Sequence, residues 1–153
     1  LTELINSGSI SDPRRLSFTA PDDPIWLTCA PSDLEIVLSN LVDNAVKYAG
    51  EKAEIAVTLA RQDDHFVLTV EDDGPGIPAG KREEVFNRFV RLASSSTYGS
   101  GLGLALVKEI VTRLGGEVKL GSSKRLNGLI VTARLPAEAE ADASSDGPLR
   151  AAG

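Results

Sequence analysis

The chain has 153 residues, of which 42% are hydrophobic and 25% are charged, and its net charge is −6. These values are typical of one soluble globular domain that buries a core. The acidic balance argues against a general nucleic-acid-binding surface, and no apolar stretch is long enough for a membrane span, so we expect neither partner. The single cysteine, Cys29, cannot form an internal disulfide, which favours a reducing compartment.

The N-terminal part of the sequence predicts strands and turns. Residues 1–5 are compatible with a strand or a helical turn and are followed by a loop. Residues 16–20 alternate between apolar and polar side chains and predict a strand. A turn with two prolines leads to the apolar run 25–29, which predicts a second strand with Cys29 in the core.

Residues 33–49 predict an amphipathic helix. Ser32 is a suitable N-cap with Glu35 three residues later, and Gly50 follows the last turn. Apolar side chains at helical spacing form one stripe, made of Leu34, Val37, Leu38, Leu41, Ala45 and Tyr48. Beside this stripe Asn40, Asn44 and Lys47 form a polar row at i, i+4 and i+7, as expected where a helix leaves the core and lines a cleft.

A β-hairpin is predicted next, from the alternating segments 55–59 and 66–70. Its second strand continues into Asp72, whose register places the carboxylate on the same face as the apolar side chains. A carboxylate on the core side needs a polar partner. Gly74 and Gly76 follow in a tight turn, where glycine lets the backbone approach a ligand closely.

The segment 79–100 is mostly polar, with one short helical piece predicted near 82–89. Phe86 and Phe89 can anchor it by packing, while Arg88 and Arg91 can reach a phosphate. Its serine-rich end has little to bury, so we expect 79–100 to be a mobile lid that a ligand orders.

A glycine run then opens a second apolar helix at Gly103, whose buried face is marked by Val107, Ile110 and Leu114. Free N–H groups at a helix start favour phosphate. A final hairpin is predicted from 118–120 and 129–135, and the tail 137–153 has the composition of a disordered segment. The whole pattern predicts an α+β fold, a two-layer sandwich with helices on one face of a mixed, largely antiparallel sheet.

Each motif taken alone has an ordinary explanation. A polar row is most often the solvent face of a helix. Asp-Gly and Pro-Gly are common turn pairs, so a plain acidic turn also explains this motif. A lone GxGxG is weak, and neither a dinucleotide fingerprint nor a Walker A motif is present.

Four boxes in this order resemble the ATP-binding catalytic domain of bacterial sensor histidine kinases. They are LSNLVDNAVKY at 38–48, DDGPGIP at 72–78, VFNRF at 85–89 and GSGLGL at 99–104. The resemblance covers about 16–136, which we take as the catalytic domain, and it extends to the wider GHKL superfamily with the Bergerat fold. The asparagine box and the continuation of the glycine box to Lys108 point to histidine kinases within it.

The resemblance implies ATP and Mg²⁺ as ligands under a flexible lid, and roles for matching residues. Asn44 would coordinate Mg²⁺ with help from Asn40, and Asp72 would accept from the adenine amine. Catalysis is expected to involve Asn40, Asn44, Lys47 and Arg91. The nucleotide is expected to contact Asn40, Asn44, Lys47, Tyr48, Asp72, Gly74, Gly76, Ile77, Phe86, Arg88, Phe89, Gly99, Ser100, Gly101, Leu102, Gly103 and Leu104.

The chain departs from the family pattern in two places. It has no phosphoacceptor helix, because His65, its only histidine, does not have the expected acidic neighbour after it. Only 6–15 separate the first two expected strands, where relatives carry a full helix, so we expect 1–15 to be a shortened edge.

The resemblance implies that the γ-phosphoryl group goes to a histidine on a separate dimerisation domain, with a response regulator as further partner. It also implies the cytoplasmic part of a membrane-anchored sensor. Two alternatives stay open: a nucleotide-binding regulatory module without transfer activity, and a serine kinase or ATPase of the same superfamily.

Overall fold

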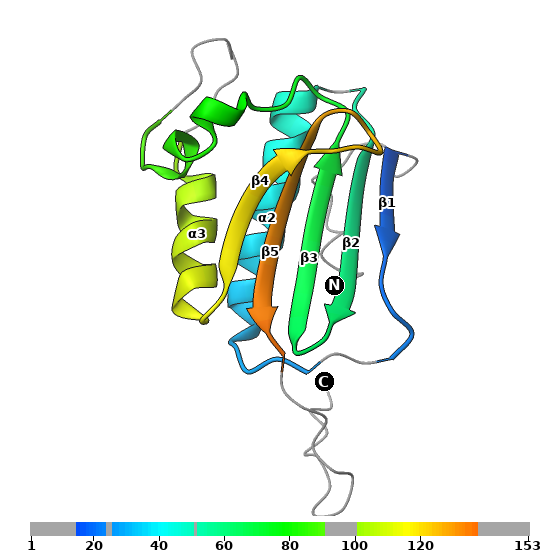
Figure 1. Cartoon of the computed structure of the whole chain (residues 1–153), viewed down its shortest axis with the longest axis vertical. Coiled ribbons are helices and arrows are strands. Elements are labelled where there is room, and N and C mark those ends of the chain that lie inside the picture. Colours follow the sequence, from blue (N-terminus) through cyan, green and yellow to red (C-terminus); the bar gives the residue numbers. More distant parts are fainter. Residues whose placement is uncertain (1–14, 24–25, 51, 91–100, 138–153) are drawn as a thin grey trace, which may run out of the picture.

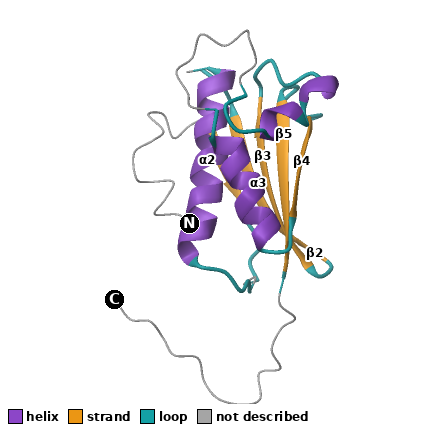
Figure 2. Cartoon of the chain, turned by 90° about the vertical axis from the view of Figure 1, so that its left-hand side faces the viewer, coloured by secondary structure: helices purple, strands orange, loops and turns teal. Residues whose placement is uncertain are grey.

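The computed structural model describes residues 15–23, 26–50, 52–90 and 101–137. Within these residues the chain forms two layers, a five-stranded sheet and a helical layer on one of its faces (Figures 1 and 2). The elements, in chain order, are β1 (Leu16–Thr19), α2 (Pro31–Ala49), β2 (Ile55–Gln62), β3 (His65–Asp72), α3 (Gly103–Arg113), β4 (Glu117–Ser122) and β5 (Leu129–Pro136).

The sheet has the strand order β1-β2-β3-β5-β4. β1 runs parallel to β2, and the other neighbouring strands are antiparallel. Both predicted hairpins are present, β2–β3 across Asp63 and Asp64 and β4–β5 across 123–128. The predicted α+β sandwich with a mixed, largely antiparallel sheet is therefore confirmed.

The core lies between the sheet and the two helices. Alternation along the strands turns one face of each inward, and the helical stripes meet that face. Its buried members include Val37, Leu41, Val57, Phe66, Leu68, Val70, Val107, Ile110, Val111, Val131, Ala133 and Leu135. Tyr48, which ends the predicted stripe of α2, lies outside this core and is exposed.

The start of α2 differs from the prediction. The helix begins at Pro31 with Ala30 as N-cap, and no side chain caps it, so Ser32 and Glu35 do not form a capping box. Proline suits the first helical position because its missing N–H would be unpaired there anyway. Asp33, also in the first turn, instead accepts a hydrogen bond from Arg113 Nη2 at 2.8 Å, which ties the start of α2 to the end of α3. Gly50 follows the last turn, as predicted, at φ +99°.

The strand predicted at 25–29 is wrong. Residues 26–29 have no strand structure, Trp26 is 57% exposed, and Cys29 is only half-buried. The apolar composition of this segment favoured a strand, but among the described residues β1 pairs with β2 alone, and residues 26–29 lead to the start of α2. Residues 24–25 lie outside the described residues, as do the strand considered at 1–5 and the tail at 138–153.

The described part of the predicted lid, 79–90, contains two short 3₁₀ turns in place of one helical piece. They are η2 (Ala79–Lys81) and η3 (Glu84–Phe86). Phe86 is buried and anchors this segment, whereas Phe89 is 74% exposed and does not, which corrects the expectation that both aromatics pack. Phe89 has a positive φ of 66°, and its N–H donates to the Gly101 carbonyl at 3.1 Å. Residues 91–100 lie outside the described residues, so the lid stays a prediction.

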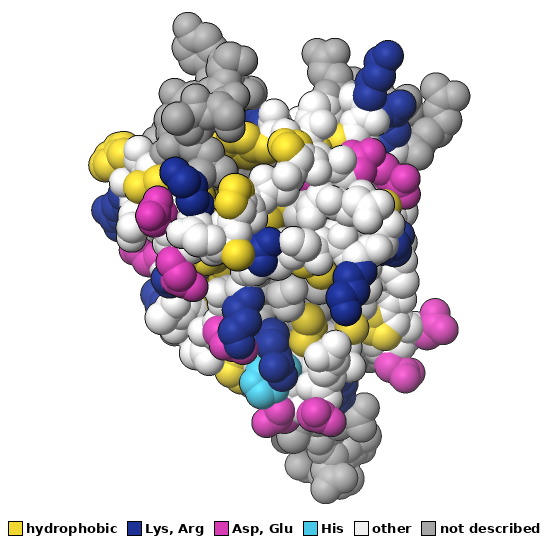
Figure 3. All heavy atoms as spheres, turned by 45° about the horizontal axis from the view of Figure 1, so that its top comes forward, with side chains coloured by type: hydrophobic (Ala, Val, Ile, Leu, Met, Phe, Trp, Pro, Cys, Tyr) yellow, Lys and Arg dark blue, Asp and Glu magenta, His cyan; other side chains and the backbone are white. Residues whose placement is uncertain are grey.

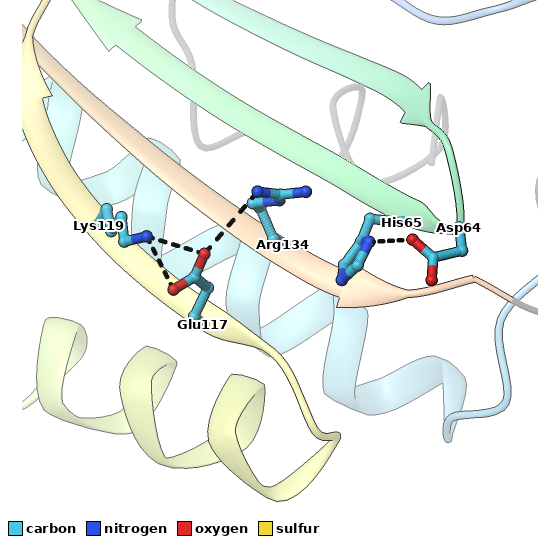
Figure 4. A network of polar contacts seen from close by, with 5 residues as sticks. All are labelled: Asp64, His65, Glu117, Lys119 and Arg134. Atoms are coloured by element: carbon cyan, nitrogen blue, oxygen red, sulfur yellow. Dashed lines mark hydrogen bonds and ion pairs between the residues drawn. The ribbon is translucent and has the colours of Figure 1, made fainter.

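The face of the sheet turned away from the helices carries charged side chains (Figure 4). On this face Lys119 Nζ contacts both carboxylate oxygens of Glu117 at 2.9 Å, and Arg134 lies 4.0 Å from one of them. The hydrogen bond from Lys119 lowers the pKa of the exposed Glu117 carboxyl. His65 Nδ1 lies 2.6 Å from Asp64 Oδ1 at the β2–β3 turn. Exposed pairs of this kind contribute little to stability, because solvent screens them.

No helix in the described part of the chain is long and apolar enough to cross a membrane. The molecule has one end at which several predicted boxes meet, the upper end in Figure 1. The end of α2, the end of β3, the β4–β5 connection and the start of α3 all lie there. Figure 3 brings this end toward the viewer.

Candidate functional site

Asp72, the last residue of β3, is a buried carboxylate with 5% of its surface exposed. Its Oδ1 accepts two backbone hydrogen bonds, from Gly74 N–H at 2.9 Å and from Leu129 N–H at 3.2 Å. These are the partners that its core-side register requires. Burial raises the pKa of Asp72, and the two N–H groups oppose this without cancelling it. Oδ2 has no hydrogen-bond partner among the described residues, so it is available to a donor on a ligand.

The turn after Asp72 is packed closely against the end of α2. A Cβ on Gly74 would lie 2.7 Å from the Cα of Ala49 and 2.9 Å from Asp72 Oδ1, so only glycine fits. Gly76 has a φ of +68°, a conformation that glycine adopts without strain. Asp73 points elsewhere, and its Oδ1 accepts from Glu54 N–H at 3.0 Å. Asp72, rather than Asp73, therefore faces inward at this turn.

The start of α3 lies against the polar row of α2. A Cβ on Gly103 would lie 3.0 Å from Asn40 Oδ1 and 3.3 Å from Asn44 Nδ2. Asn40 is oriented by a hydrogen bond from its Nδ2 to the Ile36 carbonyl at 2.8 Å. No side chain caps α3, so the N–H groups of its first turn are available to an anion. The asparagine box and the glycine box, which are about 60 residues apart in the chain, thus form one corner.

Asn44 has an unusual hydrogen-bonding state. Its Nδ2 is buried and has no hydrogen-bond partner among the described residues. A buried donor without a partner costs free energy, so it calls for an explanation. A phosphate oxygen or a metal-bound water would satisfy Nδ2, and after a flip of the amide group Oδ1 would face the same position.

A magnesium site at this corner would need oxygen ligands from a nucleotide. Among the described residues, no three His, Cys, Asp or Glu side chains come together as a metal site. Mg²⁺ keeps several waters and takes phosphate oxygens, so one amide oxygen from the protein is sufficient. Asn44 beside Gly103 therefore fits this ion once its amide is flipped, because Oδ1 then takes the position of the unpartnered Nδ2.

The described segment 79–90, which contains Phe86, contacts α3 through charged groups. Lys108 Nζ lies 4.8 Å from the centre of the Phe86 ring and 4.0 Å from Glu83 Oε2. Arg88 Nη2 donates to Glu109 Oε2 at 2.8 Å, so its guanidinium is held by α3. Both ion pairs are exposed and are weak enough to exchange for a ligand.

The other predicted site residues are distributed around this end of the molecule. Lys47 and Tyr48 are exposed on the last turn of α2, and Leu102 is exposed just before α3. Ile77, Gly101 and Leu104 are half-buried, and Gly101 has a φ of +68°. Arg91, Gly99 and Ser100 lie outside the described residues, so their roles stay predictions.

Residues 29–139 match the family described as "Histidine kinase-, DNA gyrase B-, and HSP90-like ATPase". The chain belongs to this family. It is a histidine-kinase-type ATPase catalytic domain, as its relatives and structural neighbours are sensor histidine kinases or parts of them.

Two relatives show the extent of the match. The "Signal transduction histidine-protein kinase AfsQ2" of Streptomyces coelicolor is 37% identical over 119 residues, which is 76% of this chain and 22% of that protein. "Sensor protein RstB" of Escherichia coli is 33% identical over 155 residues, which is 81% of this chain and 35% of that protein. The histidine-kinase-type domain thus spans about a third or less of these two relatives.

Solved structures agree on the fold. The "Mycobacterial sensor histidine kinase MprB" superimposes with a TM-score of 0.74 at 35% identity, over 89% of this chain and 95% of that one. The "ATP binding domain of PrrB from Mycobacterium Tuberculosis" gives 0.68 at 26% identity, over 90% of both chains.

One part of the site of this histidine-kinase-type domain, the β4–β5 connection, lies outside the four sequence boxes. Leu129 supplies one of the two N–H groups on Asp72, and Gly128 packs against both Asp72 and Gly74. Asn127-Gly128 is a common turn pair that would have indicated a tight connection. No pattern in the sequence indicates that this connection reaches β3, because the two segments are more than 50 residues apart.

The raised pKa of Asp72 makes the stability of the histidine-kinase-type domain depend on pH in a specific direction. When the folded pKa lies above the unfolded value, the native state holds the proton more tightly, so stability falls as pH rises from the ordinary aspartate range through the raised pKa. Asp72→Asn removes this titration. We expect the free energy of unfolding of the variant, relative to wild type, to increase over that window and then level off. Urea unfolding of both proteins at a series of pH values measures this. A difference that is constant with pH, or that declines, would contradict it.

Proposed function

We propose that this chain binds Mg·ATP and donates the γ-phosphoryl group to a histidine on a dimerisation and phosphoacceptor domain of its parent protein. The observation that carries the proposal is the corner formed by Asn40, Asn44 and Gly103, with a buried amide of Asn44 that lacks a partner. Asp72, near the same end of the molecule, supplies an acceptor for the base.

Base recognition would depend on the free oxygen of Asp72. An ionised carboxylate only accepts hydrogen bonds, so Oδ2 selects a base with an amino group where adenine has one. Gly74 and Gly76 keep this side of the site free of side chains, so the ring can lie against backbone. Ile77, half-buried after the turn, would add apolar contact to the ring.

Phosphate binding would depend on the corner between α2 and α3. The uncapped first turn of α3 offers N–H groups and the positive end of the helix dipole. Asn44 would hold Mg²⁺, Asn40 would bind a phosphate oxygen or a metal-bound water, and Lys47 would add a charge. Bound Mg²⁺ would neutralise charge on the phosphates during transfer.

In phosphoryl transfer the protein mainly positions its ligands and stabilises charge. The chain's own residues would orient the terminal phosphate toward an external histidine and exclude water from it. Arg88 could leave Glu109 for a phosphate, and we place Arg91 and the glycine run 99–101 on the same lid. The parent would then pass the phosphoryl group to a response regulator, and we place the domain on the cytoplasmic side of a membrane-anchored sensor.

The proposal predicts that label from ATP reaches a histidine only when a phosphoacceptor domain is present. Incubation with γ-labelled ATP and Mg²⁺ should give no acid-labile label on this chain alone, because His65 is held by Asp64 on the sheet face opposite the helices. Adding the parent's dimeric phosphoacceptor domain should give labelled acceptor. Omitting Mg²⁺ is the control and should abolish the label.

Three results would count against this function. Label on the chain alone that His65→Ala removes would place the acceptor here. Binding of Mg·ATP with no transfer would favour the regulatory module. Release of phosphate or label on serine would favour the ATPase or serine kinase alternative.

A further inference from the structure

The connection between β4 and β5 is closed on itself by the buried residue Ser123. Its N–H donates to the Gly128 carbonyl at 2.9 Å, its carbonyl accepts from Asn127 N–H at 3.1 Å, and its Oγ accepts from Leu126 N–H at 2.9 Å. Asn127 has a positive φ of 66°. These bonds hold 123–128 in one conformation, because each fixes a different part of a short segment.

This connection is pressed against Asp72. A Cβ on Gly128 would lie 2.6 Å from Gly74 N and 2.7 Å from Asp72 Oδ1, and it would also clash with the Asp72 carbonyl oxygen. These are backbone atoms and a fixed carboxylate, so they cannot move aside without displacing the turn. The next residue, Leu129, donates its N–H to Asp72 Oδ1 at 3.2 Å. The absence of a side chain at 128 is therefore what allows this hydrogen bond.

A second link joins the connection to the far side of the same turn. Arg82 donates from Nε to the Ile77 carbonyl at 3.0 Å and from Nη2 to Ser122 Oγ at 2.7 Å. The turn 73–78 is thus attached to the β4–β5 segment at both of its ends, through Asp72 and through Arg82.

We propose that the β4–β5 connection determines base selectivity by positioning the Asp72 carboxylate, with Gly128 and Ser123 as positioning residues. This rests on the proposed function, in which Asp72 binds the amino group of adenine. Both backbone N–H groups contact Oδ1, so one oxygen is held and the other alone meets the base. The same N–H groups favour the ionised form, which accepts from a 6-amino group. A protonated carboxyl would donate instead, and would suit a 6-oxo group.

Other charges around Asp72 do not replace these N–H groups. Among the described residues, Asp73 is the one neighbouring side chain that acts on the pKa of Asp72, and it raises this pKa. Glu71 is paired with Arg125 at 2.9 Å. Arg82 is half-buried and donates to the Ile77 carbonyl and to Ser122 Oγ. Other charged or titratable side chains on the surrounding elements are exposed, among them Lys47 and Tyr48 on α2, Glu54 before β2, and Lys124 in the connection.

The test compares the affinities of the full chain for Mg·ATP and Mg·ITP, which differ by a 6-amino and a 6-oxo group, at several pH values. Gly128→Ala should displace Leu129 N–H and lower the ATP/ITP affinity ratio by about tenfold, the size expected for one charge-assisted hydrogen bond. The pH at which wild type loses its preference for ATP should move upward in the variant, since the lost N–H favoured the ionised form. Gly80→Ala is the matched control, because a Cβ there meets nothing within 4 Å.

Ser123→Ala is the second variant, since Gly128→Ala can also weaken the fold. It removes the hydrogen bond from Leu126 N–H to Ser123 Oγ and leaves the groups proposed to contact the nucleotide in place. It should therefore lower the ATP/ITP affinity ratio and raise the pH midpoint, each by a smaller amount than Gly128→Ala. Ser39→Ala, which removes an exposed hydroxyl on α2, is its control.

The outcomes separate this inference from the function on which it rests. If wild type does not prefer ATP, or if Asp72→Asn leaves the preference intact, the base-binding role of Asp72 fails. If wild type and Asp72→Asn behave as proposed, but the folded variants lose ATP and ITP affinity equally with an unchanged midpoint, the connection is only structural and the inference is overturned. If Gly128→Ala does not fold, the result for Ser123→Ala decides between these outcomes.

Discussion

Replacing Asn44 by alanine is expected to lower phosphoryl transfer to the phosphoacceptor domain by about a hundredfold or more, the loss seen when one preorganised polar group is removed from a developing charge. Asn44 is the residue of the α2–α3 corner whose buried amide lacks a partner among the described residues. Without the Asn44 side chain, the affinity for ATP should be no higher in the presence of Mg²⁺ than in EDTA. Calorimetry in both conditions, together with labelled transfer, measures these losses.

The same variant should retain its stability, which separates a functional loss from a structural one. Alanine removes an unsatisfied donor and is a better helix former, so the free energy of unfolding should stay equal or rise by up to about 1 kcal/mol. Asp43→Ala is a matched control, because Asp43 is the exposed neighbour on the same helix. Full transfer by Asn44→Ala, or an equal loss by Asp43→Ala, would remove Asn44 from the proposed site.

Asp72→Asn is expected to weaken Mg·ATP binding by roughly 1.5–3 kcal/mol, the value for a lost hydrogen bond to a charged group. Asparagine can keep its carbonyl oxygen on the N–H groups of Gly74 and Leu129, which leaves its NH₂ group facing the base. The NH₂ group of the new asparagine would then face the 6-amino group of adenine, and both are donors. A 6-oxo base would instead place an acceptor opposite the NH₂ group. Selectivity for ATP over GTP and ITP should therefore fall.

Competition binding of ATP, GTP and ITP to wild type and Asp72→Asn measures this change. Asp73→Asn is the control, because Asp73 accepts from Glu54 N–H and does not share the partners of Asp72. If Asp73→Asn changes selectivity and Asp72→Asn does not, the base contact belongs to a different carboxylate than the one we propose.

Much of the fold and part of the candidate site could be predicted from the sequence. Alternation in β2 and β3 and helical spacing in α2 and α3 indicated the elements and their buried faces, because these periods follow from backbone geometry alone. The same alternation placed Asp72 on the core side, and its burial is observed. Spacing on α2 likewise placed Asn40 and Asn44 on one side of the helix, where Gly103 meets them.

Other features depend on contacts between segments that are distant in the chain, and no local pattern indicates them. Local composition favoured a strand at 25–29, but in the structure residues 26–29 pair with no strand of the sheet. Ser32 had the chemistry of an N-cap, yet α2 begins two residues earlier than predicted, at Pro31 with Ala30 as N-cap. Arg88 pairs with Glu109 of α3 because packing of the 79–90 segment brings it there, and no local pattern indicates this contact.

The sequence by itself determined which side chains we propose to bind a nucleotide. Residue type sets the polarity of each side chain, and the helical or strand period sets the face on which it lies. Tertiary structure alone decided what holds them. Asp72 depends on Leu129 N–H and on the space that Gly128 leaves. The hydrogen bond joins residues that are 57 positions apart, and it requires two backbones to approach closely. Both features follow from the order and register of the strands, which depend on the whole sheet and not on any single segment.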